Sequence, residues 1–165
     1  MILVINLDDE QLENKDYNQR DKIIEYATSK DMQIIETSLQ TEIEISQLDK
    51  SNQDEFLHEL GIDEPGVNLI AKAMYDILNL ISFFTVGEDE VRAWTIKKGL
   101  NAKQAAGKIH SDLERGFIRA ETVSYQDFKN AGYSISNAKD MGLWRLEGKN
   151  YIVKDGDILN IRFNV

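Results

Sequence analysis

The part of the chain that most restricts its fold is residues 81–121, where β-type runs bracket a helix-type run. Residues 83–86 and 91–96 are apolar or alternating, and the turn-type residues 87–89 lie between them. A turn between two such runs predicts a β-hairpin. The helix-type run that follows, over residues 102–113, then has to lie across a face of the sheet to which this hairpin belongs.

The rest of the carboxyl-terminal half continues this order. We expect Asn101 to cap the helix and Gly116 to end it. The further expected elements are a strand at 117–123, a short helix at 125–131, a strand at 143–146, and a hairpin of residues 151–153 and 158–163 around Asp155-Gly-Asp157. Strands in this order around one crossing helix predict a β-grasp (ubiquitin-like) fold.

The amino-terminal half is expected to be part of an α/β domain. The continuous apolar run Met1–Ile5 is typical of a strand buried on both faces of a parallel sheet. We expect a helix at 17–30, a strand at 32–35, a helix at 51–60 capped by Ser51, and an apolar helix stripe from Leu69 to Ile81. A βαβ unit of only two strands is an incomplete sheet, so dimerisation through its exposed edge is possible.

Charge divides the chain in the same way. The 165 residues carry a net charge of −10, to which residues 1–81 contribute −12 and residues 82–165 contribute +2. Such a contrast suggests two domains with different partners. We therefore expect an α+β chain made of a partial α/β domain, 1–81, and a β-grasp domain, 82–165.

Composition also limits the cellular setting. The chain has no cysteine, which excludes disulfides and thiolate metal sites. It shows no signal segment and no apolar run near the roughly 20 residues of a membrane span. We expect a soluble cytoplasmic protein with no membrane partner.

No catalytic residue and no metal site are expected from the motifs. Gly107-Lys-Ile109 resembles the end of a P-loop, but Ile109 stands where Ser or Thr binds magnesium. His58 and His110 fall in different expected domains, so they do not build a metal site. His110 and Asp112 are two residues apart on an expected helix and do not face each other. A surface or capping role is therefore expected for His110.

One stretch of the second half is rich in basic residues. Trp94 and Phe117 are interleaved with seven cationic side chains: Arg92, Lys97, Lys98, Lys103, Lys108, Arg115 and Arg119. Basic residues among aromatic ones are typical of RNA-binding surfaces. A surface that contacts RNA or another polyanion and an ordinary solvated face both account for the pattern.

Several sequence segments of the second half match those of a known family and occur in the same order. They include Glu90-Val-Arg-Ala-Trp-Thr95, Glu114-Arg-Gly-Phe-Ile-Arg-Ala-Glu121, Arg145-Leu-Glu-Gly-Lys149 and Arg162-Phe-Asn-Val165. From about Ile81 onward the chain resembles the TGS domain of the YchF/Obg-like ATPase family. The resemblance implies a β-grasp module that contacts the ribosome, RNA or a protein partner. The alternative is a packing or regulatory domain with no ligand of its own.

The first half is similar to the end of the nucleotide-binding domain of the same family. Asn6-Leu-Asp-Asp9 matches its base-reading motif Asn-x-x-Glu, with Asp9 where glutamate is usual, and Ser38 matches its second base-contacting loop. The resemblance implies that Asn6, Leu7, Asp9 and Ser38 contact a nucleotide base.

The resemblance also implies what this chain lacks. The family's P-loop, magnesium-binding threonine, switch glycine and hydrolytic histidine have no counterpart here. We expect the full-length parent to hydrolyse ATP, or GTP, with Mg²⁺. This chain alone is expected to hold no cofactor, to bind nucleotide weakly if at all, and to hydrolyse nothing.

Overall fold

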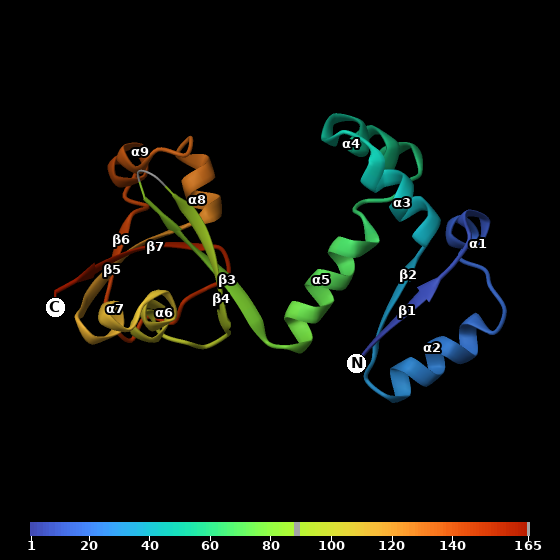
Figure 1. Ribbon diagram of the computed structural model, residues 1–165, viewed down its shortest axis with the longest axis horizontal. Coiled ribbons are helices and arrows are strands. Elements are labelled where there is room, and N and C mark those ends of the chain that lie inside the picture. The colour runs from blue at the N-terminus through green and yellow to red at the C-terminus, as the bar shows by residue number, and fades with distance from the viewer. Residues whose placement is uncertain (88–89, 165) are drawn as a thin grey trace. The chain divides into compact units, whose positions relative to one another are not determined.

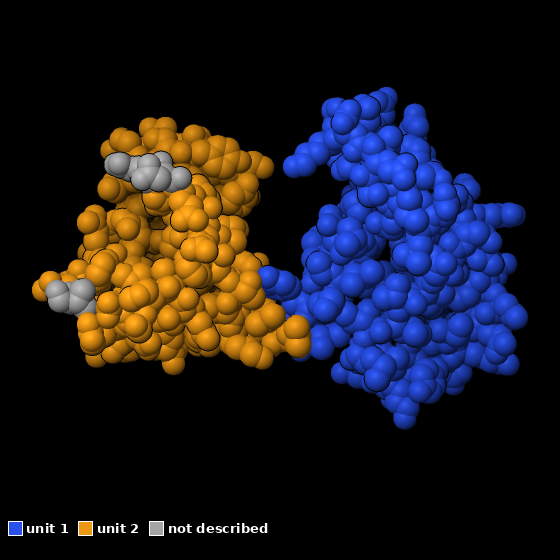
Figure 2. Space-filling view, in the orientation of Figure 1, with its two compact units in different colours: residues 1–77 blue, residues 78–165 orange. Residues whose placement is uncertain are grey.

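The computed structural model describes residues 1–87 and 90–164. The chain forms two compact units, residues 1–77 (unit 1) and 78–165 (unit 2), drawn in different colours in Figure 2. The sequence-based boundary, between residues 81 and 82, lies slightly further along the chain. Each unit has its own sheet and its own buried residues, so each is described by itself.

Unit 1 is built on the predicted βαβ arrangement. Strand β1 (Ile2–Asn6) pairs in parallel with β2 (Gln33–Thr37), and α2 (Arg20–Ser29) connects them. The register runs from Ile2 opposite Gln33 to Asn6 opposite Thr37, so the carboxyl ends of both strands meet at one edge. Figure 1 shows β1 and β2 side by side.

Strand β1 is less buried than its apolar sequence predicted. Val4 is 42% exposed, and the other residues of the strand are partly buried or exposed. Within the part of the chain that the structure describes, only β2 pairs with β1. The prediction of a strand buried on both faces is therefore wrong for this chain, because two strands and their helices cover too little of its surface. Dimerisation through this edge stays a prediction.

Four further helices of unit 1 accompany the strands. They are α1 (Asp9–Asn14), α3 (Leu39–Gln47), α4 (Lys50–Glu59) and α5 (Gly66–Ile77). The sequence did not predict α1 or α3. Asp49, not Ser51, precedes the first turn of α4. Gly61, at φ 64°, allows Ile62 N–H to donate to Leu57 C=O at 2.9 Å beyond the end of α4.

The predicted apolar stripe from Leu69 to Ile81 is divided between two elements. Helix α5 ends at Ile77, and Asn79 has a positive φ of 54°. Strand β3 (Leu80–Val86) then begins, so Ile81 belongs to the sheet of unit 2. The apolar pattern did not reveal this boundary, because the buried residues of a helix and of the strand that follows it are both apolar.

Unit 2 is a mixed sheet with the strand order β4-β3-β7-β5-β6. The predicted hairpin is confirmed: β3 pairs antiparallel with β4 (Val91–Lys97), although residues 88 and 89 of its turn lie outside the described residues. Strand β7 (Asp157–Phe163) lies parallel to β3 and antiparallel to β5 (Phe117–Ser124), which also pairs with β6 (Arg145–Glu147). The first and last strands of the unit are thus neighbours near the middle of the sheet (Figure 1).

Helices pack on both faces of this sheet. On one face α6 (Ala102–Ile109) buries Ala102 and Ala105 against Phe83 and Leu159. On the other, α8 (Tyr125–Asn130) buries Phe128 with Val123 and Ile158. Two more short helices lie in the described part of unit 2: α7 (Ser111–Arg115) and α9 (Ile135–Asp140). The sequence did not predict α9.

The helix predicted at 102–113 is in fact two helices. The cap by Asn101 is confirmed, since its side chain accepts a hydrogen bond from Gln104 N–H at 2.9 Å. The chain becomes extended at His110, whose Nδ1 accepts from Asp112 N–H at 3.1 Å and caps α7. The expected capping role of His110 is therefore confirmed.

The hairpin predicted around Asp155-Gly-Asp157 is wrong. Ile152 forms an isolated bridge with Asn101, and β7 pairs with β3 and β5 instead. The turn itself is present and holds β3. Ser82 N–H donates to Asp155 Oδ1, and Gly156 N–H donates to Ser82 C=O, both at 2.8 Å. A turn motif shows where a chain reverses but not which strands it joins.

A buried carboxylate closes this turn. Asp157 is 1% exposed, and its Oδ2 accepts hydrogen bonds from Tyr151 OH at 2.8 Å and from Lys154 N–H at 2.9 Å. Burial, the hydrogen bond to Asp157 and the charge of that carboxylate raise the pKa of Tyr151. Asp157 thus fixes the segment that leads into β7.

No helix within residues 1–87 and 90–164 combines the length and apolar character that crossing a membrane requires.

A half-buried tyrosine should make unit 1 sensitive to alkali. Tyr17 OH donates to Glu36 at 2.7 Å, and burial, this hydrogen bond and the Glu36 charge raise the pKa of Tyr17 to about 12. The unfolded chain releases this proton near the ordinary pKa of 10.0, so the free energy of unfolding should fall as pH rises from 10 toward 12. Urea unfolding of unit 1 at a series of pH values checks this. Tyr17→Phe should flatten the profile, and an unchanged slope would contradict the assignment.

Candidate functional site

The family-matched base-contact residues lie at the carboxyl ends of β1 and β2. Asn6 ends β1, and Leu7 N–H continues the strand pairing by donating to Thr37 C=O at 2.9 Å. Asn6 Oδ1 accepts from Leu39 N–H at 3.0 Å, across a separation of 33 residues in the chain. The edge beyond the carboxyl ends of parallel strands is where α/β sheets bind ligands.

Thr41 joins Asp9 and Ser38 within the same site. Its hydroxyl donates to Asp9 Oδ1 at 2.5 Å, and its N–H donates to Ser38 Oγ at 3.3 Å. Hydrogen bonds from Thr41 and Ser38 lower the pKa of Asp9. The structure therefore brings Asn6, Asp9 and Ser38 together, as the resemblance implies, and keeps Asp9 ionised at neutral pH.

The four residues differ in what they offer a ligand. Leu7 and Ser38 are only 6% and 1% exposed, so their side chains belong to the packing of the site. Asn6 and Asp9 are exposed. Among the described residues, the Asn6 amide nitrogen has no hydrogen-bond partner, so it can donate to a base edge while Oδ1 holds Leu39. A role in base contact for these residues stays a prediction.

Sequence reasoning missed two residues that hold the site in place. One is Thr41, and the other is Glu42, whose Oε1 accepts from Gly66 N–H at 2.6 Å and from Thr37 OH at 3.2 Å. Both lie in the first turn of α3, for which Ser38 is the cap. A Ser cap followed by a glutamate in the first turn was the available signal.

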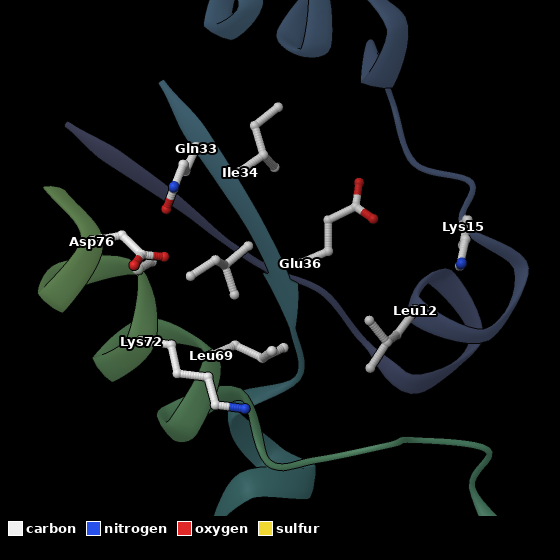
Figure 3. Close-up of a pocket in the computed structure, with 10 residues that line it drawn as sticks. Leu12, Lys15, Gln33, Ile34, Glu36, Leu69, Lys72 and Asp76 are labelled. Atoms are coloured by element: carbon white, nitrogen blue, oxygen red, sulfur yellow. The ribbon is translucent and has the colours of Figure 1, made fainter. Parts of the chain in front are cut away.

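A pocket of unit 1 lies elsewhere, along β2. It has a volume of about 560 Å³, and none of the four family-matched residues lines it. Figure 3 shows Leu69, Lys72 and Asp76 of α5 on one side of β2 and Leu12 and Lys15 on the other. Lys72 is engaged with Glu64 at 2.6 Å. The mixed charges of this pocket give no sign of a nucleotide site.

The basic stretch does not form one cluster. Lys97 pairs with Leu80 at the start of β3, whereas Arg119 pairs with Arg162 at the end of β7, and β3 and β7 are parallel. Lys97 and Arg119 thus lie at opposite ends of the sheet. Lys103 and Lys108 lie on α6, which packs on one face of it.

Three of the seven residues have partners of their own. Lys97 Nζ donates to Leu78 C=O at 3.2 Å. Arg92 lies 4.8 Å from the Trp94 ring centroid and 3.9 Å from a Glu90 oxygen. Arg115 pairs with Asp112 at 3.0 Å. All seven residues are exposed, as a contact surface requires. Their role as an RNA or ribosome surface stays a prediction.

Comparison with known proteins assigns the chain to a family. A model described as YchF-GTPase carboxyl-terminal, protein of unknown function (DUF933), matches residues 80–164. "Ribosome-binding ATPase YchF" of Bacillus subtilis (strain 168) is 46% identical over 166 residues, covering 100% of this chain and 45% of the relative. "Obg-like ATPase 1" of Gallus gallus is 42% identical over 166 residues, covering 99% of this chain and 41% of the relative.

The fold agrees with a solved member of this group. The structure of the Schizosaccharomyces pombe YchF GTPase matches with a TM-score of 0.84 and 31% identity, covering 98% of this chain and 43% of that one. This chain spans less than half the length of the curated relatives that it matches. It belongs to the YchF/Obg-like ATPase family and corresponds to the carboxyl-terminal part of the longer members.

Proposed function

We propose that this chain is the ribosome-contacting and base-contacting part of a ribosome-associated ATPase, and that it acts in the cytoplasm. The observation that carries the proposal is the 46% identity, along the whole chain, to a protein named for ribosome binding and ATPase activity. Unit 2 is the interaction module in this proposal. Its mixed sheet, with first and last strands parallel and neighbouring and with α6 across one face, supports a β-grasp fold of the TGS type.

Unit 1 supplies base contacts in this proposal but no hydrolysis. Asn6 and Asp9 face solvent at the carboxyl edge of the sheet, while Leu7 and Ser38 shape it. A phosphate cradle and Mg²⁺ ligands belong to the longer protein, which would bind ATP or GTP. Base contacts alone provide little of the binding free energy of a nucleotide. Calorimetric titration of this chain with ATP should therefore show no micromolar affinity, and such affinity would overturn this part of the proposal.

Cosedimentation with ribosomes tests the role of unit 2. We expect this chain to pellet with ribosomes at about 50 mM KCl and to be released at about 300 mM, because contacts to RNA phosphates weaken steeply with salt. ATP should not change the result, since the nucleotide-responsive part is outside this chain. Absence of binding at both salt concentrations would favour the alternative, a packing or regulatory domain without a ligand of its own.

A further inference from the structure

The outer edge of β2, in unit 1, carries backbone groups that its own sheet does not use. Leu7 N–H donates to Thr37 C=O at 2.9 Å, which fixes the phase of the parallel pairing between β1 and β2. In a parallel pair, alternate residues of a strand bond the neighbouring strand through both N–H and C=O, and the residues between them point the other way. Since Thr37 bonds β1, Glu36 and Ile34 direct their N–H and C=O groups away from it.

These outward groups border the pocket of about 560 Å³ that lies along β2. Four successive residues of the strand, 33–36, line it. Because successive side chains of a strand point to opposite faces, a pocket that touches all four lies along the edge of the strand rather than over one face. Among residues 1–87 and 90–164, β2 pairs only with β1, and no hydrogen bond reaches the outward N–H groups of Ile34 and Glu36. The pocket is thus an open edge of the sheet.

Two walls enclose this edge. Figure 3 shows Leu69 of α5 on one side of β2 and Leu12 of α1 on the other. Ala73, also on α5, lines the same wall as Leu69 and is buried. We call the space between these walls, along residues 33–36, the edge groove. Its walls offer apolar contacts to the alternate side chains of a strand that enters it.

A carboxylate without a partner lies at the amino end of the edge groove. Gly66, the first residue of α5, lies against Thr37 at the carboxyl end of β2. The helix runs back along the strand from there, which brings Asp76 beside Gln33 (Figure 3). Asp76 is exposed and has no hydrogen bond or ion pair within the described residues. This end of the groove therefore attracts a cation.

An ammonium group without a partner lies at the other end. Lys15 follows α1, and Tyr17 OH, two residues further on, donates to Glu36 at 2.7 Å near the carboxyl end of β2. Glu36 is neutralised by Arg20 at 3.3 Å, whereas Lys15 has no such contact in the part of the chain that the structure describes. The edge groove is therefore positive toward the carboxyl end of β2 and negative toward its amino end.

Helix α5 decides between a single peptide and a second copy of this chain as the occupant. It packs against β2, with Ala73 buried, and forms one wall of the groove. Two-fold antiparallel pairing of β2 with β2 of another copy would place both α5 helices on the same face of the joined sheet. Paired strands lie about 4.8 Å apart, whereas packed helices need about 8–10 Å between their axes. A single extended segment has no such helix and fits between the walls.

We propose that the edge groove binds an extended peptide segment of a partner protein, which adds to β2 as a further strand. The segment runs antiparallel to β2, the more stable pairing, and exchanges backbone hydrogen bonds with Ile34 and Glu36. The charges of the groove define its chemistry. An acidic residue lies beside Lys15, an apolar residue packs against Ala73, and a basic residue lies beside Asp76. This interaction is separate from the ribosome contact proposed above.

NMR titration of the nitrogen-15-labelled chain with the acetylated and amidated peptide Glu-Thr-Val-Thr-Lys tests the pairing. In the antiparallel register its two threonines lie opposite Glu36 and Ile34, so we expect the amide signals of these two residues to shift most. Methylating the backbone nitrogens of both threonines removes two hydrogen bonds and should weaken binding about tenfold. Methylating the valine nitrogen is the matched control, because that N–H points away from β2.

A charge exchange tests the polarity of the groove. Asp76→Lys should weaken binding of this peptide about fivefold, and a peptide that ends in glutamate instead of lysine should regain the loss. Asp54→Lys makes the same change at an exposed residue of α4, outside the groove, and should leave affinity unchanged. The spectrum of each variant without peptide verifies that it folds.

Three results would overturn the inference. The first is the absence of shifts at Ile34 and Glu36 at millimolar peptide concentration. The second is equal weakening by methylation at the valine and at the threonines, which would exclude pairing along this edge. The third is equal weakening by Asp54→Lys and Asp76→Lys, which would mean that net charge alone acts. None of these measurements involves ribosomes or nucleotide, so their failure is distinguishable from failure of the proposed function.

Discussion

Replacing Gly66 with alanine is expected to lower the free energy of unfolding of unit 1 by about 3 kcal/mol, as overpacking of a tight site does. A Cβ at this position would collide with Thr37 Oγ1 and would lie only 2.9 Å from Thr37 Cβ. Neither atom is the end of a flexible side chain, and Thr37 is buried at the end of β2. The added methyl group would push the first turn of α5 away from the strand and weaken the bond from Gly66 N–H to Glu42.

Urea unfolding followed by circular dichroism, with hydrogen exchange of β1 and β2 amides, measures the effect of Gly66→Ala in unit 1. Gly148→Ala is the matched control, because no atom lies within 4 Å of its added Cβ. We expect the control to change stability by less than about 0.5 kcal/mol. A Gly66→Ala protein as stable as the control would show that α5 does not depend on this close approach.

Replacing Asp157 with alanine is expected to destabilise unit 2 by about 3 kcal/mol. The change would leave the Tyr151 hydroxyl and Lys154 N–H without their acceptor, and an unsatisfied buried donor costs about 1–3 kcal/mol. Tyr151→Phe removes one of the two bonds and should cost about 1 kcal/mol. Fluorescence of Trp94 and Trp144 during urea unfolding reports on unit 2 alone, because both tryptophans lie in it.

The control for Asp157→Ala lies two residues away. Asp155 accepts one hydrogen bond, from Ser82 N–H, and is exposed to solvent. Water can satisfy that donor after Asp155→Ala, so we expect a loss of about 1 kcal/mol or less. If both aspartates cost the same, burial of Asp157 would not be the cause of its contribution.

Sequence patterns correctly predicted those parts of the fold that form between residues close together in the chain. The hairpin of β3 and β4, the Asn101 cap and the βαβ unit each depend on residues close together in the chain. Pairing between distant segments was not predicted. Residues 151–153 were expected to pair with β7, whereas they lie beside the start of α6. A single sequence carries turn and period signals but no direct record of which strands meet.

The candidate sites show the same limit. The rule that ligands bind beyond the carboxyl ends of parallel strands predicted that Asn6 and Ser38 lie close together, and the bond from Leu39 N–H to Asn6 agrees with it. The long-range bond from Gly66 N–H to Glu42 was not predicted, because the helix-cap signal at Ser38 and Glu42 indicates only where a helix begins. The basic stretch was defined by neighbours in sequence. The structure separates Arg119 from Lys97, which lie at opposite ends of the sheet of unit 2.

The parallel pairing of β3 with β7 has a consequence for synthesis of the protein. Phe84 lies opposite Ile158, so the strand that starts unit 2 gains this neighbour only after almost the whole unit has been translated. Contacts this distant in sequence slow folding, because a long loop must close before they form. Until then the nascent chain exposes one edge of β3. Unit 2 is therefore expected to fold in a late step, after its last strand has left the ribosome exit tunnel, rather than progressively during elongation.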